Sequence, residues 1–272
     1  MTGRNLPCPC GSRLKYKRCC GKAAAIVPAP QRQSINGPAV MCLMPTRGAI
    51  SIETVQSLSR TDRLTVMLQA VARKPVDVAR NELVHLARSA IKTAAFTPMG
   101  GWLVLWIDDD AWWRSGTLTQ AIQALYDHPE IDLLAGWFSP RAPNSCPAAR
   151  RIDGSWPRPG IDCQPGDIVE VARVGFHFAV HRFSLLDDLP GDPFSLDAKD
   201  EAEDFAFCRR AREAQKRIWV HTGLPIAHVA DDGSAFLPGE PAFRIFGAEL
   251  LKGDQPQAHS YGAAVDARAS IS

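Results

Sequence analysis

The chain has 272 residues, of which 46% are hydrophobic and 22% charged, and its 31 basic and 29 acidic residues give a formal net charge of +2. This composition excludes a disordered chain and favours a globular protein with one large domain and a small appendage. The first 40 residues contain seven basic residues and no acidic residue, which leaves a net charge of −5 on the remainder. No segment has the apolar length of a membrane span or the features of a signal peptide, so the cytoplasm is the expected location.

Four of the eight cysteines lie close together near the N-terminus, at Cys8, Cys10, Cys19 and Cys20. Four thiolates can complete a tetrahedral zinc shell, and a segment this short needs such a ligand to fold. The alternatives are two disulfides or a flexible basic tail, but clustered cysteines in a reducing compartment bind metal more often than they pair.

The sequence PCPCGS, followed by KYK and CCG, closely resembles the SEC-C motif of the SecA translocation ATPase. The resemblance covers about residues 4–22 and implies one structural Zn²⁺ held by the four cysteines. In that family the motif is an add-on that contacts proteins, so the resemblance also implies a protein partner for this segment. We therefore predict a zinc motif at residues 1–24 and, because small, polar and Pro residues follow, a linker at residues 25–38.

From residue 39 onward, short apolar segments alternate with amphipathic ones. The pattern predicts strands at residues 39–44, 63–71, 102–107, 131–138, 168–178 and 217–221, and a further short apolar stretch at 224–229. Helices are predicted at residues 51–59 and 77–91, from residue 115, and from about residue 200. Such alternation favours an α/β fold with a mostly parallel sheet over residues 39–238. Residues 139–165 have no assignable regular structure, and residues 239–272 are predicted to be a poorly ordered extension.

The first two predicted helices have clear apolar spacing. In the first, Ser51 is a suitable N-cap and the apolar residues of one face are Ile52, Val55 and Leu58. In the second, the residues expected to face inward are Val78, Leu83, Leu86 and Ile91.

Three consecutive carboxylates, Asp108, Asp109 and Asp110, follow the apolar strand at residues 102–107. In an open α/β sheet, ligands bind beyond the carboxyl ends of the strands. Strand alternation would direct Asp108 and Asp110 to one side and Asp109 to the other, which gives an Asp-x-Asp pattern suited to a cation. A solvated turn is the alternative.

Two later segments contain further candidate residues. Glu203 and Asp204 lie at the start of a predicted helix, where the macrodipole favours acids even without catalysis. His228 lies in a short apolar stretch and is either a hydrogen-bonded core residue or the imidazole that completes an Asp-bearing cation site.

The order of these motifs is more specific than any one of them. The segments PTR at 45–47, ARN at 79–81, LWIDDD at 105–110, EDFAFCRRA at 203–211 and IAHV at 226–229 make residues 39–230 similar to nucleotide-sugar-dependent glycosyltransferases of the GT-A fold, particularly the family-2-like group. The resemblance implies a Rossmann-like, mixed sheet and a hexosyltransferase-like activity.

The same resemblance implies roles for individual residues. The divalent cation would be held by Asp108, Asp110 and His228. Asp204 would be the general base, with Glu203 as its close substitute. The nucleotide-sugar would contact Pro45, Thr46, Arg47, Arg80, Asn81, Asp108 and Asp109. Arg80 could instead be a solvated helix-face arginine. Carboxylate and phosphate oxygens suit Mg²⁺ or Mn²⁺, and the imidazole nitrogen favours Mn²⁺.

Two other functions stay open at this stage. The chain could be a non-catalytic, zinc-containing adaptor on the same scaffold, or a two-metal phosphoryl-transfer enzyme built on the Asp cluster. The sequence identifies neither the donor sugar, the acceptor nor the stereochemistry. Seven basic residues with Tyr16 as the aromatic residue among them are a weak nucleic-acid footprint, so nucleic acid is not an expected partner.

Overall fold

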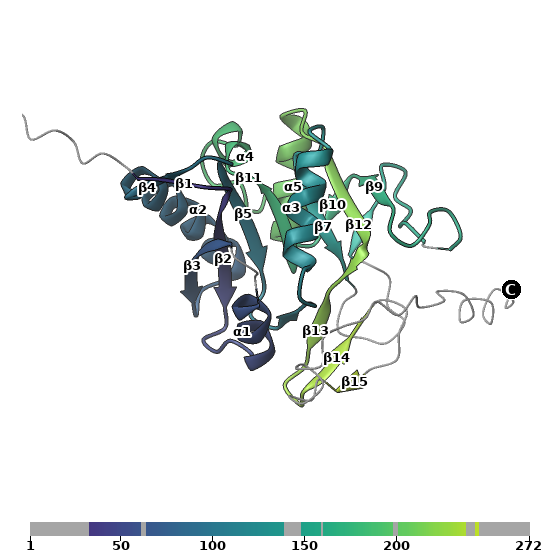
Figure 1. The fold of residues 1–272 in the computed structure, drawn as a ribbon. Coiled ribbons are helices and arrows are strands. Elements are labelled where there is room, and N and C mark those ends of the chain that lie inside the picture. Colours follow the sequence, from purple (N-terminus) through teal and green to yellow (C-terminus); the bar gives the residue numbers. More distant parts are fainter. Residues whose placement is uncertain are drawn as a thin grey trace, which may run out of the picture. The chain divides into compact units, whose positions relative to one another are not determined.

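The computed structural model describes residues 33–60, 64–138, 148–158, 160–197, 201–237 and 243–244 (Figure 1). The predicted zinc motif, most of the predicted linker and nearly all of the predicted C-terminal extension lie outside these residues. The chain divides into two compact units, Met1–Ser34 with Ala94–Thr97, and Ile35–Thr93 with Pro98–Ser272. The described part of the smaller unit contributes to two short paired strands, β1 (Gln33–Ile35) and β4 (Phe96–Pro98). β1 thus lies within the segment that the sequence predicted as linker.

The larger unit contains, in its described part, a seven-stranded sheet with the order β3-β2-β5-β11-β7-β12-β9. Its strands are β2 (Ala39–Thr46), β3 (Thr65–Ala72), β5 (Trp102–Ile107), β7 (Leu133–Trp137), β9 (Ile168–Val171), β11 (Phe178–Arg182) and β12 (Ile218–Pro225). β2 pairs in parallel with β3 and β5, and β7 with β12, whereas β11 lies antiparallel between β5 and β7, and β9 antiparallel to β12. The predicted α/β fold with a mixed sheet is confirmed.

Helices cover both faces of this sheet (Figure 1). They are α1 (Ile52–Ser59), α2 (Val76–Thr93), α3 (Thr117–Asp127), α4 (Ser184–Asp188) and α5 (Glu203–Glu213). Residues of α2, α4 and α5 share one core with Met41 and Leu43, and residues of α3 share the other with Val40 and Cys42. Because successive side chains of β2 point to opposite faces, this central strand is apolar throughout, as a strand buried on both faces requires.

The described part of the larger unit also contains two smaller sheets, and the first of them begins directly after the three carboxylates. One has the order β15-β14-β13-β6 and consists of β6 (Ala111–Trp112), β13 (Ala227–Val229), β14 (Ser234–Phe236) and β15 (Phe243–Arg244). The other pairs β8 (Ala149–Arg150) with β10 (Arg173–Val174). β8 lies inside the segment 139–165 for which the sequence indicated no regular structure.

The capping prediction for α1 is confirmed, but its apolar face is not the buried one. The Ser51 hydroxyl accepts a hydrogen bond from the Thr54 backbone N–H. Ile52 and Val55 are 62% and 45% exposed, whereas Thr54 is fully buried. The Thr54 hydroxyl lies 3.1 Å from the Asp109 carbonyl and 2.7 Å from the Ala111 carbonyl. The polar face is therefore buried because it binds the backbone of the carboxylate loop.

The inward face predicted for α2 is correct at Leu83 and, in part, at Ile91, which is partly buried against the core. Val78 and Leu86 are exposed, and the buried residues are instead Ala79, Arg80, Asn81, Leu83, Val84 and Ala87. The apolar spacing of the helix does not predict which face is buried. That face is buried because Arg80 and Asn81 bind polar partners in other segments. The helix consequently directs Arg80 toward the carboxylate loop.

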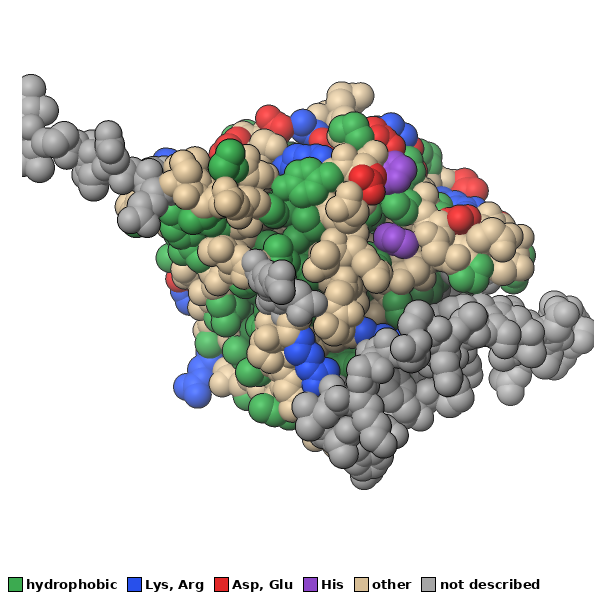
Figure 2. Space-filling model, in the orientation of Figure 1, with side chains coloured by type: hydrophobic (Ala, Val, Ile, Leu, Met, Phe, Trp, Pro, Cys, Tyr) green, Lys and Arg blue, Asp and Glu red, His purple; other side chains and the backbone are tan. Residues whose placement is uncertain are grey.

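The surface shows no large region of one charge on the side drawn in Figure 2, where acidic and basic side chains lie next to one another along the upper edge. Within the described ranges, no helix is both long and apolar enough to span a membrane.

Candidate functional site

The carboxylate triplet lies in a turn that three other segments hold in place. β5 ends at Ile107, so Asp108, Asp109 and Asp110 do not continue its alternation. The Asp108 N–H donates to the His177 carbonyl at 3.4 Å, the Asp109 carbonyl accepts from Ser51 N–H at 2.8 Å, and the Asp110 carbonyl accepts from Val229 N–H at 2.8 Å. These backbone bonds, rather than strand alternation, bring Asp108 and Asp110 to the same place.

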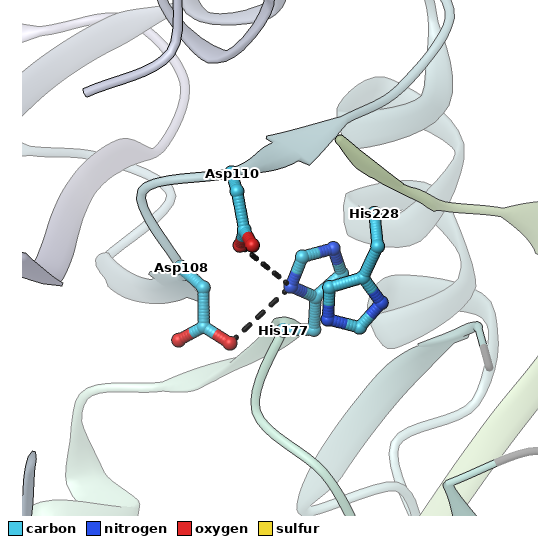
Figure 3. A group of neighbouring side chains, drawn as sticks. All are labelled: Asp108, Asp110, His177 and His228. Carbon is cyan, nitrogen blue, oxygen red and sulfur yellow. Dashed lines mark hydrogen bonds and ion pairs between the residues drawn. The ribbon is translucent and has the colours of Figure 1, made fainter. Parts of the chain in front are cut away.

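Four side chains converge beside this turn: Asp108, Asp110, His177 and His228 (Figure 3). One ligand atom from each lies within 4.8 Å of all the others. Two ligands on opposite sides of a first-row divalent cation lie about 4.3 Å apart, so small side-chain shifts would bring all four into coordination range. The set of two carboxylates and two imidazoles suits a cation that accepts both oxygen and nitrogen ligands, such as Mn²⁺.

Strand register explains how residues far apart in the sequence meet here. β11 pairs with β5 so that Phe178 is opposite Ile107, which places His177 next to Asp108. β13 pairs with β6 so that His228 is opposite Ala111, the residue after Asp110. The two imidazole rings are stacked, with centroids 3.5 Å apart.

His177 is held in an orientation that suits a metal ligand. Its Nε2 lies 3.0 Å from the Ala227 carbonyl oxygen, which can only accept, so Nε2 carries a proton. Its Nδ1 faces Asp108 Oδ2 at 3.2 Å and Asp110 Oδ1 at 3.7 Å (Figure 3). Such a second hydrogen bond is the usual way in which a protein orients an imidazole toward a cation.

Asp109 is buried, and its carboxylate holds the segment at the end of β2 in place. Its Oδ2 accepts hydrogen bonds from the Arg47 backbone N–H at 2.8 Å and from the Thr46 hydroxyl at 3.0 Å, and its Oδ1 lies 3.3 Å from Arg47 Nη2. Arg47 Nη2 is also 3.8 Å from Asp110 Oδ2. Asp109 thereby positions Arg47, whose side chain is 59% exposed.

Arg80 is buried, so the alternative of a solvated helix-face arginine is wrong. It is 2% exposed and lies among the rings of Trp106, Phe176 and Phe194. Its Nη2 donates to Asp108 Oδ1 at 2.9 Å, and its Nε lies 3.3 Å from Glu203 Oε1. Burial raises the pKa of Asp108, but the Arg80 guanidinium and the His177 hydrogen bond outweigh it and lower that pKa to about 2. Asp108 is therefore ionised at neutral pH.

Three of the four converging side chains, Asp108, Asp110 and His228, line a cavity of about 290 Å³. Its lining comprises Pro45, Thr46, Arg47, Lys74, Val76, Arg80, Asp108, Asp109, Asp110, Glu203 and His228. Carboxylates and basic side chains thus alternate around one opening. A cation and the anionic group that it neutralises could bind here together.

The two candidate bases have different environments at the start of α5. Glu203 lines the cavity and faces Arg80. Burial, followed by the neighbouring Glu203 carboxylate, raises the pKa of Asp204 to about 7. A carboxylate with this pKa is suited to proton transfer at neutral pH.

Gly175 permits the close packing around Asp204. A Cβ at this position would lie 2.6 Å from Phe138 Cζ and 3.2 Å from Asp204 Oδ2. The Phe138 ring also contacts both imidazoles, with centroids 5.2 Å from His177 and 5.7 Å from His228. Because Gly175 has no side chain, the Phe138 ring can pack close to Asp204 as well as against the stacked histidines.

Most of the described site residues that the sequence suggested line the cavity, with two exceptions, Asp204 and Asn81, and several additions. Asn81 is not among the residues that line the cavity, because its amide accepts from Phe194 N–H at 2.9 Å and donates to Ser195 Oγ at 3.3 Å. Lys74, Val76 and His177 were missed. The sequence signal for His177 was a single histidine at the start of an apolar strand, and only the antiparallel pairing of that strand with β5 gives it meaning.

The N-terminal motif is confirmed by comparison with known protein families. The family model of the SEC-C motif matches residues 4–22. The protein translocase subunit SecA of Pelotomaculum thermopropionicum is 71% identical over 24 residues, which are 9% of this chain and 3% of that protein. The chain thus shares with SecA a short motif that spans a small fraction of the relative's length.

Solved structures similar to this chain include A197 from STIV and two glycosyltransferases. The crystal structure of A197 from STIV has a TM-score of 0.58 at 14% identity, over 82% of this chain and 100% of that one. The mannosyltransferase PcManGT from Pyrobaculum calidifontis, solved with GDP-Man and Mn²⁺, has a TM-score of 0.36 at 17% identity, over 76% of this chain and 62% of that one. A glycosyltransferase involved in glycosylation of the major capsid of PBCV-1 has a TM-score of 0.33 at 11% identity, over 68% of this chain and 81% of that one. Only the first score is high enough to show a shared fold, and at these identities none transfers an activity.

Proposed function

We propose that the larger unit is a metal-dependent glycosyltransferase that moves a sugar from a nucleotide-sugar donor to an acceptor hydroxyl. The observation that carries this proposal is the meeting of Asp108, Asp110, His177 and His228 at the edge of a cavity lined by basic side chains. One group of four ligands suits one divalent cation, and the two imidazoles favour Mn²⁺ over Mg²⁺.

The cavity offers complementary charges for a diphosphate. When bound, the cation stabilises the negative charge that collects on a leaving nucleoside diphosphate. Arg47, which pairs with Asp109, and Lys74, which pairs with Glu82, line the same cavity. Their side chains are 59% and 45% exposed, so both can contact phosphate oxygens from the exposed side. Arg80 fixes the Asp108 carboxylate on the inner side. Pro45, Thr46 and Asp109 shape the loop that presents Arg47.

The transfer itself needs a base and no covalent intermediate if the configuration inverts. The acceptor oxygen forms a bond to the anomeric carbon while the bond from that carbon to the phosphate oxygen breaks, and the bonding electrons leave with the diphosphate. The proton of the acceptor hydroxyl passes to Asp204, which we assign as the base. Glu203 is the less suitable base because its carboxylate already pairs with the Arg80 guanidinium at 3.3 Å.

Titration of the full-length protein with UDP, GDP and CDP, with and without Mn²⁺, tests this function. We expect one nucleotide to bind only with Mn²⁺, and its sugar conjugate to be hydrolysed slowly without acceptor. Asp110→Asn should abolish the Mn²⁺-dependent binding, whereas Asp127→Asn, an exposed residue on α3, should leave it unchanged. If no nucleotide binds in the presence of Mn²⁺, the glycosyltransferase proposal fails.

The same titration separates the two alternative functions. An adaptor would keep its partner interaction in Asp110→Asn and would bind no nucleotide. A two-metal phosphoryl-transfer enzyme would take up two Mn²⁺ ions about 3.5–4 Å apart in addition to zinc. The described residues contain one candidate group of metal ligands, which favours a single cation.

We also propose that Cys8, Cys10, Cys19 and Cys20 hold a structural Zn²⁺ and that this segment contacts a protein partner. The support is the SEC-C match to residues 4–22, which contains all four cysteines. A four-thiolate shell is closed and leaves no position for catalysis. Metal analysis should find one Zn²⁺ per chain, and a Cys19→Ser variant should lose it while keeping Mn²⁺-dependent nucleotide binding.

A further inference from the structure

Two arginines, Arg150 and Arg173, lie opposite each other in a strand pair, and neither has an acidic partner among the described residues. Arg150 in β8 and Arg173 in β10 are directly opposite in the antiparallel pair, so their side chains lie on the same face. Like charges in such a position destabilise a strand pair. Within the described ranges, neither arginine forms an ion pair, and Arg150 Nη1 is buried without a hydrogen-bond partner.

Each of these arginines is stacked on an aromatic ring. The Arg150 guanidinium carbon lies 4.3 Å from the centre of the Trp156 ring, and that of Arg173 lies 4.4 Å from the Phe205 ring. Stacking fixes the plane of a guanidinium and leaves the N–H groups at its edge free to donate. The pair is thus preorganised to bind an anion that accepts two or more hydrogen bonds, such as a phosphate or a carboxylate.

A third stacked arginine, Arg217, has the carboxylate partner that Arg150 and Arg173 lack among the described residues. Arg217 lies over Trp219 at 4.8 Å, and its Nε and Nη2 contact the two carboxylate oxygens of Glu170 at 3.1 and 2.8 Å. Arg150 and Arg173 have the aromatic ring but, among the described residues, no such carboxylate. A packing role alone would not require two unneutralised charges opposite each other.

The position of the pair connects it to the proposed base. Arg173 and Gly175 are two residues apart on an extended segment, so their Cβ directions lie on the same side. The Cβ direction of Gly175 meets Asp204 Oδ2, and Phe205, the residue after Asp204, stacks on Arg173. Arg173 and Asp204 are therefore close neighbours, because the start of α5 packs beside β10.

We propose that Arg150 and Arg173 form an acceptor subsite that binds a phosphate or carboxylate group of an anionic acceptor and presents its hydroxyl to Asp204. The inference rests on the proposed glycosyltransferase function in its assignment of the occupant as acceptor. The binding of an anion by the pair does not depend on that function.

Direct binding of three small probes to the full-length protein tests the subsite. The probes are 4-nitrophenyl β-glucuronide, 4-nitrophenyl phosphate and the neutral 4-nitrophenyl β-glucoside, titrated calorimetrically at constant ionic strength. We expect the anionic probes to bind more tightly than the glucoside. A preference for the glucuronide over the phosphate would identify a carboxylate-bearing acceptor, and the reverse a phosphorylated one.

Variants assign the binding to the pair. In Arg150→Gln/Arg173→Gln, the affinity for the preferred anionic probe should fall at least about tenfold, the effect of losing charge-assisted hydrogen bonds. Arg173→Gln alone, at an exposed position, should lower it less and serves if the double variant does not fold. The control Arg212→Gln removes one positive charge from the exposed side of α5 and should retain probe binding.

Two results would overturn the subsite. They are equal affinity of wild type for the charged and neutral probes, and equal probe affinity in Arg173→Gln and Arg212→Gln. Titration of the same variants with nucleotide and Mn²⁺ keeps this failure apart from a failure of the proposed function. Nucleotide binding without arginine-dependent probe binding removes the subsite alone, whereas arginine-dependent probe binding without nucleotide binding removes the glycosyltransferase and leaves an anion site.

Discussion

Replacing Asp204 with asparagine should stabilise the protein at alkaline pH while it removes the proposed base. Burial, followed by the Glu203 carboxylate, raises the pKa of Asp204 from 3.8 to about 7, and Arg80 only partly opposes this. The folded state therefore binds the Asp204 proton more tightly than the unfolded chain does. Between about pH 4 and pH 7 the folded state carries the extra proton, so the unfolding free energy decreases as the pH rises through this interval.

The size of the effect follows from the shift. A difference of about three pKa units corresponds to about 4 kcal/mol, at 1.36 kcal/mol per unit. This loss of unfolding free energy is complete only above the pKa of Asp204 in the folded state. Asparagine has no charge to lose, and its amide oxygen can accept the Phe205 N–H that now donates to Asp204 Oδ1 at 2.8 Å. We expect Asp204→Asn to match wild type near pH 4 and to exceed its unfolding free energy by up to about 4 kcal/mol at pH 8.

Urea unfolding followed by tryptophan fluorescence, without added divalent cation, measures this difference at pH 5 and pH 8. Asp127→Asn, which removes an exposed carboxylate from α3, should show no such pH-dependent gain. The transfer rate of Asp204→Asn should fall by about 10²–10⁴-fold, the usual contribution of a general base. A stability difference between Asp204→Asn and wild type that is the same at both pH values would refute the reasoning.

Three further predictions concern the cation site and its supports. His177→Ala should weaken Mn²⁺ binding at least about tenfold by calorimetry, and an equal loss in His85→Ala, an exposed control, would contradict a ligand role. Arg80→Met should lower the unfolding free energy by about 3 kcal/mol in urea, because Asp108 and Glu203 lose their buried counter-ion; no loss would show that the ion pairs are not structural. Gly175→Ala should reduce the transfer rate with Mn²⁺ affinity kept, since its Cβ would meet Phe138 Cζ at 2.6 Å, and an unchanged rate would exclude this packing constraint.

The sequence predicted those parts of the fold that depend on local pattern. β5 was located at its exact residues because six apolar residues end in three carboxylates, and the Ser51 cap was recognised because a short hydroxyl side chain before an amphipathic segment has one common use. The inward face of α2 was wrong at Val78 and Leu86, and the buried face of α1 is polar, because Thr54 and Arg80 are buried by bonds to partners about 55 and 28 residues away. No periodicity in a helix contains that information.

The candidate site shows the same division. The resemblance to the GT-A order of motifs groups Asp108, Asp110 and His228, and these three side chains do lie together. Strand alternation gave the right pair for the wrong reason, since the triplet lies in a turn fixed by bonds to Ser51, His177 and Val229. His177 required the position of β11 between β5 and β7, which a mostly parallel sheet does not suggest.

The charges of the cavity make cation binding and donor binding interdependent. Four lining carboxylates, Asp108, Asp109, Asp110 and Glu203, stand against the three basic residues Arg47, Lys74 and Arg80, a formal charge of −1 that a divalent cation would change to +1. A nucleoside diphosphate that entered first would meet carboxylates, whereas one that enters after Mn²⁺ meets a positive site. By linkage, the factor by which Mn²⁺ raises nucleotide affinity must equal the factor by which the nucleotide raises Mn²⁺ affinity. Under the proposed function, the site would therefore be one binding unit for a metal and a diphosphate rather than two adjacent sites.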